Sequence, residues 1–402
     1  MIDALIDPAS PPAISVRANA STRYDIRDEE QARAMLLALE EHGYAVVAQV
    51  ANQEQIAAAV TGFWEFWEAK TQRGLLRNDP RTWKPWVANS STGILVDSGG
   101  ANHCEFLWNT RTLPLVKEAF ARIWEDPDLL VSFDAGNVFR DWRHDVRWLT
   151  AAGWWHVDQN ATLGAHRQGR RSVQGLVTYF DATAETGGLT LVPGSHKEHE
   201  ALCGRAPGSK MRVDFVPVPP QDPLFLDREV ILVCARAGDL ILWDSRTVHC
   251  NSPALSMADH FERVLRQGLG GSLLGQTQAV SASASASAST SASASASASA
   301  PAYGTEQVRV PELLRLVGYV CMLPRSRVDA ATQHARKRTF VHKLGTSHWP
   351  DSKREYFPEG GDPAPWTKSR DVLSLVGYSQ AEMDAIEQGT YGNRFADRCT
   401  LS

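Results

Sequence analysis

Short apolar runs of two different periods alternate along the chain and predict a mainly β protein with flanking helices. Residues 28–41 carry apolar positions at helical spacing behind an acidic first turn, which predicts an amphipathic helix. Residues 172–180 and 229–234 are rich in β-branched and aromatic residues and are bounded by charged or glycine-containing turns, as strands are. Residues 315–322 form a further strand-like run, so the pattern predicts an α+β fold built around strands.

Polar and low-complexity segments divide this pattern. Residues 1–28 are rich in Ala, Pro and Ser and are predicted to be a flexible tail. A Ser/Ala alternation at 281–300 offers nothing to bury, so an insert at about 254–307 is predicted to be disordered. The β-rich domain is accordingly placed at 29–349, interrupted by that insert, and a helical extension at 350–402.

Composition and charge narrow the class of partners. The chain has 402 residues, 43% of them hydrophobic, and 41 basic against 46 acidic side chains give a net charge of −5. This balance gives no general attraction for nucleic acid, which favours a small-molecule substrate. Six cysteines without zinc-type spacing, and no apolar run long enough for a transmembrane segment, predict an intracellular, cytoplasmic protein.

The final four residues add one alternative to this placement. Cys399 is followed by two residues, the second aliphatic, and then by Ser402, which matches the pattern for prenylation of a cysteine. A prenyl anchor at Cys399 would attach the protein to a membrane surface.

The most informative polar pattern joins His156-Val157-Asp158 to His249. Two imidazoles and one carboxylate are the ligand set of non-haem iron(II) oxygenases, and they leave coordination positions open for other ligands. His156 and Asp158, two residues apart on a strand, would leave the same face, and His249 would come from another strand. A buried structural His–Asp pair is the alternative for these residues.

The surroundings of this motif carry a family resemblance. A Gly-Gly-Leu-Thr-Leu-Val-Pro-Gly-Ser-His block at 187–196 follows the first motif, and an Ala-Gly-Asp-Leu-Ile-Leu-Trp block at 237–243 precedes His249. From about residue 40 to residue 319, this order resembles the phytanoyl-CoA dioxygenase family of iron(II)- and 2-oxoglutarate-dependent oxygenases. The resemblance implies a double-stranded β-helix (jelly-roll or cupin-like) core, with His156, Asp158 and His249 as iron(II) ligands and 2-oxoglutarate and O2 as co-substrates.

The resemblance also implies a basic residue that binds the distal carboxylate of 2-oxoglutarate, and a guanidinium suits this because it binds carboxylates bidentately. Arg315 is the first candidate; Arg246, Arg263 and Arg266 compete with it. Arg315 follows His249 by sixty-six residues, a much larger separation than in the family, and removal of the insert restores the family spacing.

Two amide side chains are further candidates for the co-substrate site. Gln174 lies on a predicted strand close to the metal motif and would direct its amide at 2-oxoglutarate, or would be a satisfied core amide. Asn137 lies on a strand where the family often lines the pocket, with a turn or sheet-edge role as its alternative.

The activity implied by the resemblance is oxidative decarboxylation of 2-oxoglutarate to succinate and CO2, coupled to oxidation of a small organic substrate. Related halogenases replace the carboxylate ligand with a small residue, so Asp158 favours hydroxylation or desaturation. Two other classes stay open: a cupin-like metal-dependent isomerase or hydrolase that does not use 2-oxoglutarate, and a non-catalytic small-molecule-binding member of the fold.

Overall fold

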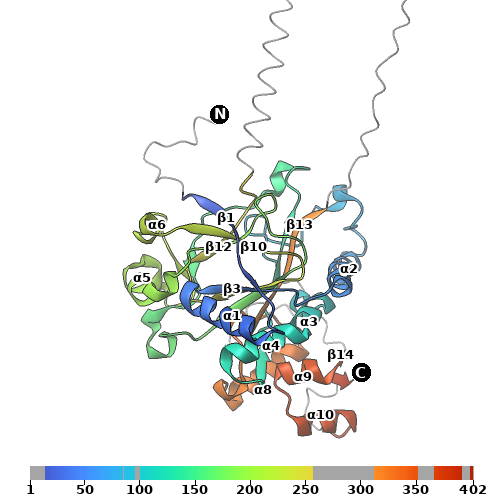
Figure 1. The fold of residues 1–402 in the computed structure, drawn as a ribbon. Helices are drawn as coiled ribbons and strands as arrows, with labels where there is room; N and C mark the ends of the chain where they lie inside the picture. Colours follow the sequence, from blue (N-terminus) through green and yellow to red (C-terminus); the bar gives the residue numbers. More distant parts are fainter. Residues whose placement is uncertain are drawn as a thin grey trace, which may run out of the picture. The chain divides into compact units, whose positions relative to one another are not determined.

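Two β-sheets pack against each other in the computed structural model (Figure 1). It describes residues 14–84, 86–95, 100–256, 312–351, 366–391 and 399–401. The major sheet contains, in spatial order, β2 (Arg23–Tyr24), β3 (Tyr44–Val47), β11 (Leu240–Asp244), β7 (Val173–Thr178), β13 (Leu313–Pro324) and β4 (Leu129–Val131), with β5 (Gly136–Arg140) also paired to β13. The minor sheet contains β1 (Val16–Ala20), β10 (Val230–Cys234), β8 (Gly188–Leu191), β12 (His249–Ser252), β6 (His156–Val157) and β9 (Val216–Pro217).

Alternation along the strands builds the core between the sheets. Leu176 and Ile241 of the major sheet pack with Leu189 and Ile231 of the minor sheet in one buried cluster. Because side chains alternate across a strand, neighbours such as Val177 face the other way, into a second cluster shared with the helices. This two-sheet arrangement is the predicted double-stranded β-helix with flanking helices.

Helices cover the outer faces of both sheets. One group of helices packs over the major sheet, and some of these helices also pack on one another. This group comprises α1 (Glu29–His42), α2 (Gln53–Lys70), α3 (Glu105–Thr112), α4 (Pro114–Trp124), α8 (Ala330–Val341), α9 (Arg370–Val376) and α10 (Gln380–Glu387). On the outer side of the minor sheet lie α5 (His199–Arg205) and α6 (Leu224–Asp227). The side chain of Asp28 caps α1 by accepting a hydrogen bond from the Gln31 amide, so the predicted helix begins where its acidic first turn indicated.

The predicted flexible tail at 1–28 is wrong for the part that forms strands. β1 pairs in parallel with β10, and β2 pairs in parallel with β3. Arg23 binds the buried carboxylate of Asp239 at 2.6 Å, which fixes β2 to the turn before β11. These partners lie more than twenty residues away for β2 and more than two hundred for β1, so local composition gave no sign of them. Residues 1–13 lie outside the described part of the chain.

The two remaining segment predictions have different outcomes. The Ser/Ala-rich insert lies, from residue 257 onward, outside the described residues, so its predicted disorder stays a prediction. In the region from 350 onward the described residues form α9, α10 and a two-stranded parallel sheet of β14 (Trp366–Lys368) and β15 (Cys399–Leu401). None of the helices in the described ranges has the length and apolarity needed to cross a membrane. Prenylation of Cys399 stays a prediction.

Candidate metal centre and co-substrate pocket

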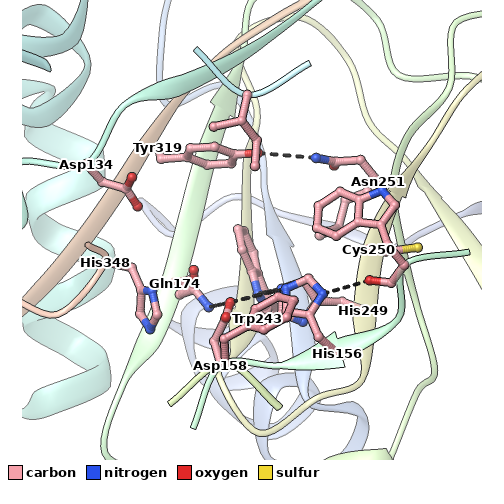
Figure 2. A pocket seen from close by; sticks show the side chains of 14 residues that line it. Asp134, His156, Asp158, Gln174, Trp243, His249, Cys250, Asn251, Tyr319 and His348 are labelled. Atoms are coloured by element: carbon pink, nitrogen blue, oxygen red, sulfur yellow. Dashed lines mark hydrogen bonds and ion pairs between the residues drawn. The ribbon is translucent and has the colours of Figure 1, made fainter. Parts of the chain in front are cut away.

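Three side chains from the minor sheet converge on one point. β6 and β12 are antiparallel neighbours, and His156 is paired directly with His249 across them. Asp158 follows β6, and its Oδ2 lies 3.6 Å from His156 Nε2 and 3.3 Å from His249 Nε2 (Figure 2). One ligand atom from each residue lies within 4.8 Å of the other two, so this cluster could hold a metal ion.

Hydrogen bonds orient all three groups for a metal. Nδ1 of His156 donates to the Trp154 carbonyl at 3.0 Å, and Nδ1 of His249 donates to the Thr247 carbonyl at 2.9 Å. With the proton on Nδ1, each Nε2 keeps its lone pair on the side of Asp158. The Gln174 amide donates to Asp158 Oδ2 at 2.9 Å. Ligand atoms held in this way fit a divalent iron site that is closed on one side.

The electrostatics of the cluster favour the protonation states that a metal needs. Burial alone would raise the pKa of Asp158, but the two neighbouring imidazoles hold that pKa well below its usual value. Burial, reinforced by the nearby His156, lowers the pKa of His249. Near neutral pH the carboxyl is therefore ionised and the His249 imidazole is neutral, so binding of a metal requires no proton release from these two groups.

Arg315 on β13 is fully buried behind the cavity wall, where it contacts Asn251. Its Nε donates to Asn137 Oδ1 at 3.0 Å and its Nη2 approaches Asn251 Oδ1 at 3.4 Å. Its Nη1 is buried and has no hydrogen-bond partner among the described residues. Burial lowers the pKa of Arg315. A buried guanidinium held by neutral amides, with one nitrogen unsatisfied, fits a site for the distal carboxylate of 2-oxoglutarate.

The other predicted residues take more specific places. Gln174 donates to the Asp158 carboxylate, and Asn137 accepts from Arg315 while its own amide donates to the Thr92 carbonyl at 2.9 Å. The competing Arg246 is bound to the buried carboxylate of Asp244 at 2.7 Å, which satisfies it within the protein. Arg263 and Arg266 lie outside the described residues.

Several functional candidates were missed by the sequence reasoning. The metal cluster lines a cavity of about 190 Å³ together with Asn251, Tyr319, Trp154 and Phe215. Asn251 and Tyr319 share strand faces with His249 and Arg315, and the Asn251 amide donates to the Tyr319 hydroxyl at 3.3 Å (Figure 2). Strand alternation could have found both of these residues.

The sequence gave weaker indications of the aromatic residues that line the cavity. Trp154 stacks on His156 with ring centres 5.1 Å apart and an interplanar angle of 8°, and Phe215 lies 4.5 Å from the same ring. Trp154 is two residues before His156, so alternation again places it on the metal side. No sequence pattern pointed to Phe215, or to Asp134 and His348, which also line the cavity.

Comparison with known proteins places the chain in a family. Residues 39–258 match the family model of phytanoyl-CoA dioxygenase (PhyH). The "Ava biosynthesis cluster protein O" of Aspergillus versicolor is 32% identical over 160 residues, which cover 37% of this chain and 50% of that protein. The chain thus spans about half the length of this relative.

Solved structures with lower identity were also found. The "non-heme alpha ketoglutarate dependent epimerase SnoN" of nogalamycin biosynthesis is 17% identical with a TM-score of 0.39, covering 56% of this chain and 78% of its own. EvdO2 of Micromonospora carbonacea var. aurantiaca, complexed with 2-oxoglutarate, is 17% identical with a TM-score of 0.32, covering 55% of this chain and 84% of its own.

The family model covers more than half of the chain and includes all three residues of the metal cluster. The chain therefore belongs to the phytanoyl-CoA dioxygenase family, whose members are oxidoreductases that depend on iron(II), 2-oxoglutarate and O2.

Proposed function

We propose that this chain is an iron(II)- and 2-oxoglutarate-dependent dioxygenase that hydroxylates or desaturates a small organic substrate. His156, Asp158 and His249 are the proposed metal ligands, and Arg315 is the proposed partner of the distal carboxylate of 2-oxoglutarate. The observation that carries the proposal is the pairing of a metal-type cluster with a buried arginine whose Nη1 has no partner among the described residues.

The chemistry of O2 and of 2-oxoglutarate decarboxylation is supplied by iron(II) when it is bound; the residues of the chain position the reactants. Gln174 holds the Asp158 carboxylate in place through its hydrogen bond. Asn137 fixes the plane of the Arg315 guanidinium, which limits the co-substrate to one direction in the cavity.

Water exclusion is the second contribution of the chain. Trp154 and Phe215 lie against His156, and His249 is only 4% exposed. Together with a bound substrate, these side chains would keep water away from the metal side and direct the oxidation to the substrate.

Anaerobic titration of the apo-protein with iron(II) and then with 2-oxoglutarate tests the proposal. We expect a visible metal-to-ligand charge-transfer band that is absent in His249→Ala and appears only at higher 2-oxoglutarate concentration in Arg315→Met. Exposure to O2 should then release succinate, and release should increase with the correct substrate.

Stoichiometric metal binding without the band would contradict the use of 2-oxoglutarate and favour the cupin-like isomerase or hydrolase. Absence of metal binding would return His156 and Asp158 to a structural pair. The band without succinate release on any substrate would favour the non-catalytic alternative.

A further inference from the structure

The cavity has a polar wall that the proposed metal and co-substrate sites do not use. Asp134, just before β5, and His348, beyond α8, both line it. Figure 2 shows these two side chains on one side of the pocket and Asn251 and Cys250 on the other. Asp134 and His348 are called the polar wall below.

Each side chain of the polar wall has an atom that lacks a hydrogen-bond partner among the described residues. Asp134 Oδ1 accepts a hydrogen bond from the Ala135 amide at 2.7 Å, and its other oxygen has no hydrogen-bond donor among the described residues. His348 Nε2 is buried and has no partner there either. The two side chains do not form an ion pair within 4 Å of each other. Two unsatisfied polar groups that face one cavity are expected to bind a ligand group between them.

The charge of the cavity indicates the sign of that group. Asp134 and Asp158 line the cavity, whereas no lysine or arginine does. In the proposed complex the charges of iron(II), Asp158, the 2-oxoglutarate dianion and the adjacent Arg315 sum to zero, and no side chain of the described residues forms an ion pair with Asp134. The nearby Arg111 donates to the backbone carbonyl of Asp134 and not to its carboxylate. Burial raises the pKa of Asp134, and the nearby His348 and Arg111 offset this shift only in part.

Two aromatic residues of the cavity wall also line an adjacent apolar groove. Trp154 and Phe215 line both the cavity and an adjacent groove of about 450 Å³. The groove is walled further by Trp155 and by Pro217, Pro219 and Pro220. Phe215 is 42% exposed although it is a large apolar residue, so it is available to pack against a ligand.

We propose that the substrate is an apolar, ring-bearing amine whose protonated nitrogen binds between Asp134 and His348 while its rings lie against Trp154 and Phe215. This assignment rests on the proposed function, because it places the substrate beside the metal cluster. An ammonium group supplies donors to both unsatisfied atoms and neutralises Asp134. The rings replace water over Trp154 and Phe215.

The test is calorimetric titration with matched probe pairs. Each pair is an arylalkylamine and its uncharged isostere, for example tryptamine and 3-propylindole, with tricyclic pairs in addition. The protein is loaded anaerobically with iron(II) and 2-oxoglutarate, and the charge-transfer band is recorded in the same sample before the probe is added. The band reports the proposed function, and the probe affinity reports the polar wall. The titration is repeated on metal-free protein, because neither Asp134 nor His348 is a proposed metal ligand.

For at least one pair, we expect the amine to bind about tenfold or more tightly than its isostere, the magnitude of a hydrogen bond to a charged group. Asp134→Asn keeps the shape and the acceptor for the Ala135 amide, and should reduce that ratio to about one while leaving the band unchanged. Phe215→Ala should weaken both members of a pair equally.

Two results would overturn the assignment: no amine that binds more tightly than its isostere, or a preference that survives in Asp134→Asn. If the protein prefers amines but shows no charge-transfer band with iron(II) and 2-oxoglutarate, the polar wall is upheld and the proposed function is contradicted.

Discussion

Replacement of Arg315 by Met should weaken 2-oxoglutarate binding strongly while changing the stability of the apo-protein little. Arg315 is 2% exposed, and its described partners are uncharged. A buried charge without a counter-ion carries a desolvation penalty of several kcal/mol, whereas Met has a similar length and none. Loss of the hydrogen bond to Asn137 costs about 1.5–3 kcal/mol, which offsets the relief of the desolvation penalty. The free energy of unfolding of the apo-protein should therefore lie within about 2 kcal/mol of the wild-type value.

The affinity for 2-oxoglutarate should fall steeply in the same variant. Removal of one partner from a buried ion pair costs about 3–5 kcal/mol, and each 1.4 kcal/mol is a factor of ten, so Kd should rise by more than about a hundredfold. The assays are urea unfolding of the apo-protein and anaerobic titration of the charge-transfer band with 2-oxoglutarate.

Arg246→Met provides a matched control with the reverse signature. Arg246 pairs with Asp244, whose side chain is 0% exposed; the carboxylate is also bound by Arg170 and by the backbone amide of Arg246. Loss of the Arg246 side chain should destabilise the apo-protein by up to about 3–5 kcal/mol and leave the 2-oxoglutarate affinity unchanged. The reasoning is refuted if Arg315→Met unfolds several kcal/mol more easily yet binds 2-oxoglutarate as the wild type does. Arg315 would then be structural, and Arg263 or Arg266 would become the candidate.

Three further predictions address neighbouring parts of the site. Gln174→Leu should weaken iron(II) binding by about 10- to 100-fold through loss of the bond to Asp158; unchanged affinity in a metal titration would contradict this role. Gly188→Ala should raise the KM for 2-oxoglutarate but spare metal affinity, because its Cβ would lie 2.9 Å from Arg315 Nη1. The folded-state pKa of His199 is lowered below 6.5 by burial, so the unfolded chain binds the proton first and stability falls as pH drops below about 6.5. His199→Gln should flatten that slope in urea unfolding at pH 5 to 7, and an unchanged slope would refute the assignment.

Strand periodicity and the family resemblance together predicted part of this site. The spacing of two residues places His156 and Asp158 on one face, and the structure adds His249 from the strand paired with β6. The same alternation ties Tyr319 to Arg315. The place of Arg315 was harder to predict, because about sixty residues separate β12 from β13 and only a family spacing linked them.

What could not be predicted depends on long-range packing. β1 and β2 are held by strands distant in the sequence and by the Arg23–Asp239 pair, which no local composition reveals. Asp134 and His348 come from segments more than two hundred residues apart, and neither stands in a recognisable motif. Predictions of this kind require the contact itself.

The division of the site between the two sheets has a consequence for its mechanics. The proposed metal ligands belong to the minor sheet or follow it directly, whereas Arg315 and its partner Asn137 belong to the major sheet. Because 2-oxoglutarate has a fixed length, the separation of the sheets decides whether it can reach both. That separation is set by the core cluster that includes Leu176 and Leu189. The core between the sheets therefore affects the proposed co-substrate site, since a change in packing that moves one sheet relative to the other would misplace the carboxylate even when every proposed binding residue is intact.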